Sequence, residues 1–176
     1  MVQLVKAAPA TITVPDDYLT IQEAINNADE GDTVFVRNGT YYESVVVNKT
    51  ISLIGESREA TIIDASGSDY GISITADNVT VRGFTVQGAH WWGIWIKSSG
   101  CRISDNNVVA STHEGIYLDG REPEVVVREN TIEYNCISGN RDCGILVWAS
   151  CDNQILSNIV GNNWIGIFLY LNASHN

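Results

Sequence analysis

The residues with the clearest chemical potential are His113 and Glu114, which are adjacent in the sequence, and Asp119, which follows shortly after. An imidazole and a carboxylate within reach of each other can act as general acid and base. We therefore take His113, Glu114 and Asp119 as the candidate catalytic residues. The chemistry they would support is proton transfer to and from a bound substrate. The competing interpretation is that they are polar residues of an exposed turn.

Aromatic residues recur at a regular spacing and predict a binding surface. They follow a repeated Gly-Ile-x-apolar phrase, and if its isoleucine points inward, the second and fourth residues after the glycine point outward. The expected binding residues are Trp95, Tyr117 and Phe168 at the second position, Trp148 and Tyr170 at the fourth, and Trp92 just before a glycine. Such an apolar stripe is seldom left uncovered. Sugar rings, another protein surface or a loop of the same chain could cover it.

Cysteines and glycosylation sequons indicate a protein that functions outside the cytoplasm. The four cysteines are an even number without a Cys-x-x-Cys pair, which favours disulfides over zinc. We expect a disulfide between Cys136 and Cys143, whereas Cys101 and Cys151, two coils apart, are expected to be free and buried or bonded to another chain. The sequons that permit N-glycosylation are at Asn38, Asn48, Asn78 and Asn172. We therefore expect an extracellular or cell-surface location.

The sequence offers little for a metal or cofactor. The segment Arg121–Glu124 has carboxylates that calcium could use, but a hard cation needs several oxygen ligands and this loop offers few. Calcium is thus the one cofactor left open, and no metal site is predicted. The formal net charge of -11 would repel phosphate backbones and anionic membranes. No apolar run approaches the roughly 20 residues that span a bilayer. We expect neither a nucleic-acid partner nor membrane insertion.

A repeat determines the elements that must position these residues. Gly-Ile-x-apolar begins at Gly71, Gly93, Gly115, Gly144 and Gly166, at intervals of 22, 22, 29 and 22 residues. The apolar stretches of each repeat are short and β-branched, so they predict strands, and no single repeat can bury its inner face alone. Stacking of repeats solves this problem. The pattern predicts an all-β parallel β-helix, a solenoid with coils of about 22 residues.

Stacking predicts columns of equivalent residues. The expected isoleucine column is Ile72, Ile94, Ile116, Ile145 and Ile167. A second phrase, apolar-x-x-Asn-x-apolar, predicts another column of Val81, Ile103, Val127 and Ile155 and a ladder of Asn106, Asn130 and Asn158. In this alignment the extra residues of the 29-residue interval divide into two before Val127 and five after it.

The beginning of the chain differs from the coils. Residues 1–31 are expected to form an N-terminal segment with a short capping helix, which starts at the capping box Thr20–Glu23 and ends near Gly31. Residues 32–176 are expected to form the coils. Their first strands are expected at Asp32–Val36, Ser44–Val47 and Thr50–Ile54. The C-terminal end is expected to be open, either as part of a longer solenoid or paired with another subunit.

Several segments resemble known families. The opening of the chain is similar to pectin methylesterases and other pectin-lyase-like proteins at Thr20–Ile25, Gly31–Val36, Gly39–Glu43 and Ile51–Gly55. The later Asn-rich coils resemble the parallel β-helix repeats of the NosD-like group. The resemblance implies a right-handed, single-stranded parallel β-helix, and this fold hosts both enzymes and structural proteins. The catalytic patterns of pectin methylesterases and polygalacturonases find no match. NosD-like resemblance implies copper delivery, which one Met and three scattered His disfavour.

The hypothesis that follows is an extracellular or cell-surface β-helix without catalytic activity. It would bind glycan or self-assemble into a surface layer, sheath or filament, so the expected partners are glycans or copies of itself. A homo-oligomer or a fragment of a longer solenoid is the expected state. The alternative, which the resemblance implies, is a polysaccharide-processing enzyme, a lyase or epimerase, that acts on acidic polysaccharide at His113, Glu114 and their neighbours.

Overall fold

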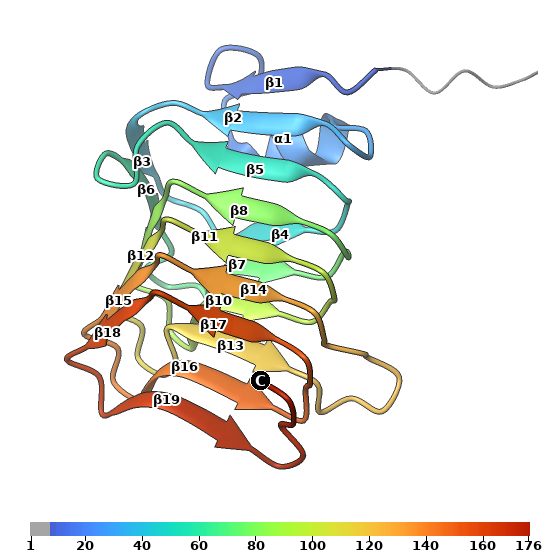
Figure 1. Ribbon diagram of the computed structural model, residues 1–176. Helices are drawn as coiled ribbons and strands as arrows, with labels where there is room; N and C mark the ends of the chain where they lie inside the picture. The colour runs from blue at the N-terminus through green and yellow to red at the C-terminus, as the bar shows by residue number, and fades with distance from the viewer. Residues whose placement is uncertain (1–7) are drawn as a thin grey trace, which may run out of the picture.

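The computed structural model describes residues 8–176, which form a parallel β-helix of about seven coils (Figure 1). All strand pairings between the named strands are parallel. The strands form three sheets along the stack, called sheets A, B and C here. The predicted all-β solenoid is confirmed.

Each sheet collects one strand from successive coils. Sheet A contains β1 (Thr11–Val14), β2 (Thr33–Val36), β5 (Ser52–Gly55), β8 (Thr80–Arg82), β11 (Arg102–Ser104), β14 (Thr131–Glu133) and β17 (Gln154–Leu156). Sheet B contains β3 (Gly39–Tyr41), β6 (Thr61–Asp64), β9 (Thr85–Gln87), β12 (Asn107–Val109), β15 (Cys136–Ser138) and β18 (Ile159–Gly161). Sheet C contains β4 (Val45–Val47), β7 (Tyr70–Ile74), β10 (Trp92–Ile96), β13 (Ile116–Asp119), β16 (Cys143–Trp148) and β19 (Ile165–Tyr170).

The predicted isoleucine column lies on sheet C. Ile72, Ile94, Ile116 and Ile145 pair in register on neighbouring strands, and all four are fully buried. Ile167 continues the register on β19 but is 47% exposed. Stacking therefore buries the branched aliphatic side chains that a single coil would leave in water.

The second column differs from the prediction at one residue. Ile103 pairs with Val81 on one side and with Ile132 on the other, so Val127 does not belong to this column. Ile132 then pairs with Ile155. The reason is that the extra residues of the long interval all lie in one connection, between β13 and β14, and are not divided between two places. The sheet registers on either side of this connection are undisturbed.

Asparagine ladders run along all three corners of the coil, where the sequence predicted one. Asn106, Asn135 and Asn158 form the ladder between sheets A and B, and each amide donates to the next side chain at 3.0–3.1 Å. The ladder between sheets C and A is Asn130, Asn153 and Asn176, and that between B and C is Asn140 and Asn163. The predicted grouping of Asn130 with Asn106 and Asn158 is therefore wrong, because Asn130 lies at a different corner.

The repeated glycines are required by close approach between coils. A Cβ atom on Gly115 would lie 2.6 Å from the Ile137 side chain and 2.8 Å from the carbonyl oxygen of Gly144. Gly71 and Gly93 have equivalent surroundings, with a valine methyl at 2.3 Å and 2.4 Å. Any other residue would push the next coil away, so the Gly-Ile repeat reflects packing.

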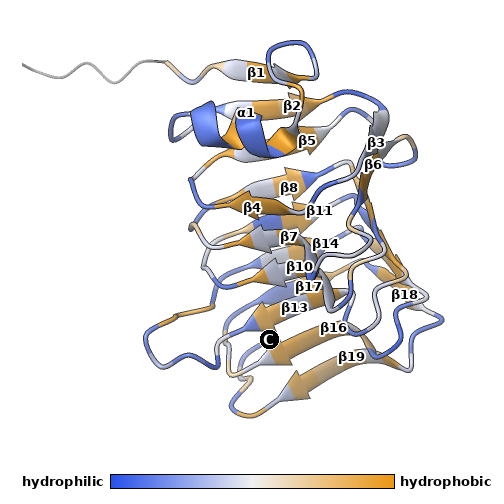
Figure 2. Ribbon diagram, turned by 180° about the vertical axis from the view of Figure 1, so that it is seen from behind, coloured by the Kyte–Doolittle hydropathy of each residue, from blue (hydrophilic) through white to orange (hydrophobic). Residues whose placement is uncertain are grey.

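The N-terminal part contains a strand that the sequence pattern did not reveal and the helix that it did. β1 pairs with β2 and begins sheet A. The helix α1 (Ile21–Asn27) buries Ile21, Ala24 and Ile25, and its N-cap Thr20 accepts a hydrogen bond from the backbone of Glu23. Figure 2 shows α1 with its apolar side toward the first coils. No helix in the described part of the chain is long and apolar enough to cross a membrane.

The cysteines correct another prediction. Within residues 8–176 all four are free thiols, so the expected disulfide between Cys136 and Cys143 is not formed. Cys136 begins β15 in sheet B, whereas Cys143 begins β16 in sheet C. The prediction failed because the insertion that this disulfide would close lies earlier, between β13 and β14. Cys101 is a buried free thiol, which was one of the two alternatives.

Candidate functional site

The outer side of sheet C carries the aromatic residues that the sequence singled out. Trp92 contacts Trp95 and Tyr117, with ring centroids 4.6 Å and 5.6 Å apart. Farther along the sheet, Tyr170 contacts Trp148 and Phe168 at 4.8 Å and 5.5 Å. We call these six residues, together with Leu146, the aromatic face. The structure thus brings the predicted residues together. Their binding role stays a prediction.

A residue of the long β13–β14 connection covers the middle of the aromatic face. The Arg121 guanidinium lies 5.3 Å from the ring centre of Tyr117 and 4.9 Å from that of Trp148. Tyr117 is consequently only 2% exposed. Of the three covers considered from the sequence, a loop of the same chain is therefore present, but it covers only part of the face. The cation–π geometry also stabilises the position of the loop.

Asp119 holds the β13–β14 connection in place. This structural role differs from the catalytic role that the sequence suggested for Asp119. The carboxylate accepts hydrogen bonds from Arg121 Nε and Nη2 at 2.7 Å and 2.8 Å and from Trp95 Nε1 at 3.1 Å. Burial would raise the pKa of Asp119, but the hydrogen bonds and the positive charge of Arg121 outweigh it and hold the pKa below its ordinary value. Asp119 is thus a structural anion.

The same loop makes a second contact with sheet C. The Glu122 carboxylate accepts from Lys97 Nζ at 2.6 Å, and Lys97 lies 4.9 Å from the ring centre of Trp95. Glu122 was one of the carboxylates considered for calcium, and here it is engaged by Lys97. A calcium ion at this loop stays a prediction.

The part of the aromatic face that Arg121 does not cover borders an open hollow of about 280 Å³. The rings of Trp148, Trp164, Phe168 and Tyr170 line it, together with Leu146, Ile165, Cys143, Glu114 and Asp142. Trp164 is 80% exposed, and Phe168 and Tyr170 are each 39% exposed. The hollow therefore combines stacking surfaces with two carboxylates.

Three possible metal ligands converge at the start of β13 and β16. A nitrogen of His113 and carboxylate oxygens of Glu114 and Asp142 all lie within 4.8 Å of one another. We call these residues the His-Glu-Asp cluster. Backbone pairing between coils brings them together, because the Asp142 amide donates to the His113 carbonyl at 3.1 Å. Asp142 was not among the candidate residues of the sequence analysis. Its position two residues before Gly144, like His113 before Gly115, is the signal that predicts the proximity.

The electrostatics of the cluster follow from burial. Glu114 is 8% exposed, and burial next to Asp142 raises its pKa. Burial and the same carboxylates raise the pKa of the adjacent Cys143 thiol to about 12. The His113 ring stacks on Trp91 with centroids 4.2 Å apart, which fixes the imidazole beside the carboxylates. Chemically, the cluster can hold a cation or exchange a proton with a group in the hollow.

Comparison with solved structures shows the fold alone. An alginate lyase from Paenibacillus sp. superposes with a TM-score of 0.66 and 18% identity over 83% of this chain and 57% of that one. Pectin methylesterase from carrot gives a TM-score of 0.63 and 18% identity over 87% and 55%. Identities this low carry no residue roles from one protein to the other.

Comparison of sequences identifies the relationship. A cell surface glycoprotein of Methanothermus fervidus is 35% identical over 95 residues, which are 52% of this chain and 16% of the glycoprotein. The chain thus matches a small part of that relative. A family model described as "Periplasmic copper-binding protein (NosD)" matches residues 25–176. Since this match covers most of the chain, including all the coils that build the site, the chain belongs to the NosD family of parallel β-helix proteins.

Proposed function

We propose that this protein is a non-catalytic glycan-binding β-helix, and that sugar rings occupy the hollow at the uncovered end of the aromatic face. The supporting observation is that three exposed rings, Trp164, Phe168 and Tyr170, and the half-buried ring of Trp148 are arranged around one hollow. Sugar rings have apolar faces that stack on aromatic side chains, and hydroxyls that hydrogen-bond to nearby carboxylates.

The location agrees with this role, because the protein is an extracellular or cell-surface β-helix. The matching family is described as periplasmic, and the relative from M. fervidus is a cell surface glycoprotein. The asparagines of all four sequons are exposed in the structure, as glycosylation requires.

The carboxylates of the hollow indicate the class of glycan. Asp142 and Glu114 line it, and the described residues that line it include no Lys or Arg. An acidic sugar would meet like charge there, whereas neutral or N-acetylated sugars could donate hydrogen bonds to the carboxylates. We therefore propose neutral or N-acetylated hexoses as ligands of the hollow.

Titration with neutral and N-acetylated hexose oligomers, followed by tryptophan fluorescence and calorimetry, tests the proposal. Trp148→Ala and Tyr170→Ala should weaken binding about tenfold each, since each removes a stacking surface. Tyr42→Ala is the matched control, because Tyr42 is 81% exposed but lies outside the hollow. Equal losses in the control and the test variants would contradict the proposal.

The same variants examine the two alternatives that the sequence left open. If the aromatic face mediates self-assembly, light scattering will show an oligomer of the wild type that Trp148→Ala dissociates. If the hollow is the site of a lyase, incubation with acidic polysaccharides will produce new unsaturated ends, and His113→Ala will abolish them. We expect a wild-type protein that binds oligosaccharide without either result.

A second candidate function is binding of a divalent metal ion by the His-Glu-Asp cluster. The convergence of three ligand atoms within 4.8 Å supports it, and the family description names copper. One imidazole nitrogen and two carboxylate oxygens suit Cu²⁺ or Zn²⁺ better than Cu⁺, which prefers sulfur. The neighbouring Cys143 thiol has a raised pKa, so it is a poor ligand at neutral pH. These donors therefore fit a cupric ion.

Calorimetric titration with Cu²⁺ and Zn²⁺ tests this second candidate. We expect one bound ion per chain, quenching of Trp91 fluorescence by Cu²⁺, and loss of both signals in His113→Gln and Asp142→Asn. His90→Gln is the control, since His90 also contacts Trp91, at 5.1 Å, but lies outside the cluster. Undiminished binding in Asp142→Asn would exclude the cluster as the site.

A further inference from the structure

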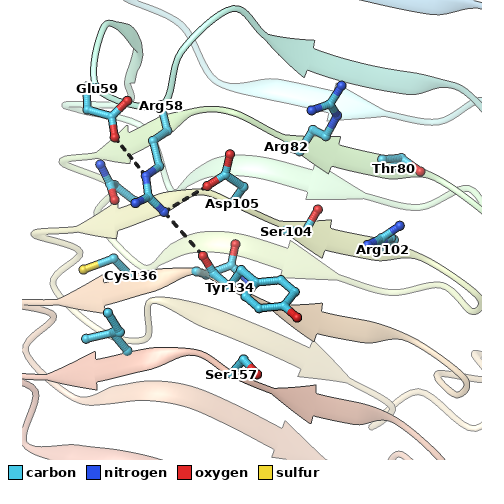
Figure 3. A pocket seen from close by; sticks show the side chains of 13 residues that line it. Arg58, Glu59, Thr80, Arg82, Arg102, Ser104, Asp105, Tyr134, Cys136 and Ser157 are labelled. Carbon is cyan, nitrogen blue, oxygen red and sulfur yellow. Dashed lines mark hydrogen bonds and ion pairs between the residues drawn. The ribbon is translucent and has the colours of Figure 1, made fainter.

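A second concave surface lies on the opposite part of the molecule, along the corner between sheets A and B. It has a volume of about 870 Å³ and is lined by β8, β11, β12, β15, β18 and four connections. We call it the corner groove. Figure 3 shows its side chains, which include Arg58, Arg82 and Arg102 from three successive coils. Three of the ten Lys and Arg residues of an acidic chain therefore converge on one groove.

Arg58 closes one end of the corner groove. It comes from the connection between β5 and β6, and its guanidinium contacts Glu59 and Asp105 at 3.0 Å each. It also donates to the backbone carbonyl of Tyr134 at 3.4 Å, a residue 76 positions later in the chain. The dashed lines in Figure 3 mark these contacts. The groove thus has a boundary fixed by Arg58, whose charge is paired with these two carboxylates.

Arg82 and Arg102 lie farther along the groove on adjacent strands. Arg102 pairs with Glu133 at 2.6 Å. Among the residues that the structure describes, none forms an ion pair or hydrogen bond with the Arg82 side chain. Arg82 therefore presents free donors to the groove, and a guanidinium binds a carboxylate with two parallel hydrogen bonds.

Tyr134 supplies an aromatic surface at an unusual backbone position. Its φ of 54° lies in the left-handed region, where the equivalent corner residues of other coils are Gly83, Asp105 and Ser157. A bulky residue is rare in this conformation and costs free energy there. The Tyr134 ring is 59% exposed and lines the groove. The sequence therefore retains an exposed aromatic residue where a small or polar one would be less strained.

We propose that the corner groove binds an acidic polysaccharide of the uronate type. Arg82 and Arg102 would bind sugar carboxylates, the Tyr134 ring would stack on a sugar face, and Thr80, Ser104 and Asn107 would contact hydroxyls. A uronate polysaccharide carries one negative charge per sugar, whereas duplex nucleic acid carries one per roughly 1.7 Å of helix axis. This protein, with a net charge of -11, would therefore repel nucleic acid far more strongly than a uronate polysaccharide. This site is separate from the hollow proposed for neutral sugars.

Titration with galacturonate oligomers at low and physiological salt tests the inference. The wild type should bind, and more weakly as salt increases. Arg82→Gln should weaken binding about tenfold, as expected for loss of one charge-assisted pair. Tyr134→Asn, which keeps a residue tolerated in the left-handed region, should weaken it severalfold. Because no residue between 8 and 176 pairs with the Arg82 side chain, its substitution should leave the melting temperature unchanged.

The control is Arg128→Gln, since Arg128 is exposed and lies outside the corner groove. Equal weakening in Arg82→Gln and Arg128→Gln would overturn the inference, because it would indicate attraction by overall charge. Absence of galacturonate binding at low salt, or equally tight binding of inorganic polyphosphate, would overturn it too. Trp148→Ala should bind galacturonate like the wild type, so failure of the hollow and failure of the groove are distinguishable.

Discussion

At the scale of the residue, Arg121 and Asp119 explain why a face of the molecule rich in aromatic residues is only partly open. Arg121 lies over two rings, and Asp119, at 2% exposure, fixes the guanidinium in that position. A buried carboxylate is stable only if it is paired and hydrogen-bonded. The pair is therefore a structural unit, and a catalytic role for His113 and Glu114 stays a prediction.

Substitution of Asp119 should make stability depend less on pH. The pKa of Asp119 is lowered in the fold, so the unfolded chain takes up its proton first as the pH falls. The stabilisation from the Asp119 carboxylate is thus complete above 3.8, the ordinary pKa of Asp, and is lost as the pH falls below that value. Asp119→Asn should cost about 2 kcal/mol at neutral pH. Urea unfolding should show this difference shrink toward pH 3, roughly a unit below the ordinary value.

Asp69→Asn is the control for this prediction, because the Asp69 side chain is 70% exposed and its contact with His90 is 3.7 Å long. Exposed ion pairs contribute little. A difference between wild type and Asp119→Asn that stays constant with pH would contradict the account of the pair.

At the scale of the element, the corner ladders connect each coil to the next through buried amides. Asn106 is fully buried, accepts from the Phe84 amide at 3.1 Å, and donates to the Val81 carbonyl at 3.1 Å. A residue in the left-handed conformation precedes each ladder position, as Asp105 does here. The bend of the chain and the hydrogen bonds that satisfy its backbone thus come from neighbouring residues.

Asn106→Ala should destabilise the fold by about 3 kcal/mol, because it leaves buried backbone groups without partners. Asn107→Ala is the matched control. Asn107 is the next residue, but its side chain donates one hydrogen bond, to the Thr85 hydroxyl at 3.3 Å. We expect a loss below about 1 kcal/mol in the control. Chemical unfolding of both variants checks the prediction, and similar losses would show that the ladder has no special role.

Gly115→Ala should destabilise the stack by about 3 kcal/mol, since the new methyl group would force apart two coils that already touch. Gly166→Ala should be neutral, because a Cβ atom on Gly166 meets nothing within 4 Å. Thermal unfolding of both variants, followed by circular dichroism, is the measurement. Equal stability of the two variants would contradict the packing explanation of the repeat.

At the scale of the whole molecule, the sequence predicted the solenoid, the isoleucine column and the aromatic face, because these depend on short periodic phrases. It misplaced Val127 because a 29-residue interval can be aligned in more than one way, although Ile132-x-x-Asn135-x-Ile137 carries the correct phrase. The corner groove was not predicted. Arg58 reaches a residue 76 positions away, and no local pattern reports such a contact.

Glycosylation is a prediction at this scale, because it concerns the whole outer surface. Mass spectrometry of peptides from natively produced protein should find glycans at one or more of the four exposed sequons. Asn48 is a favourable site, since it is exposed and lies between strands. Asn38 is less favourable, because its side chain accepts a hydrogen bond from Thr61. Unmodified peptides at all four positions would contradict the prediction.

The β13–β14 connection has a consequence for how such proteins diversify. It absorbs extra residues while β14 keeps its register with β11, and β15 keeps its register with β12. The length of a corner connection can therefore change without altering the packing of the aliphatic interior. Foreign peptides grafted between the exposed residues Pro123 and Glu124 should be displayed on an unchanged scaffold, because this position leaves the Asp119–Arg121 pair intact.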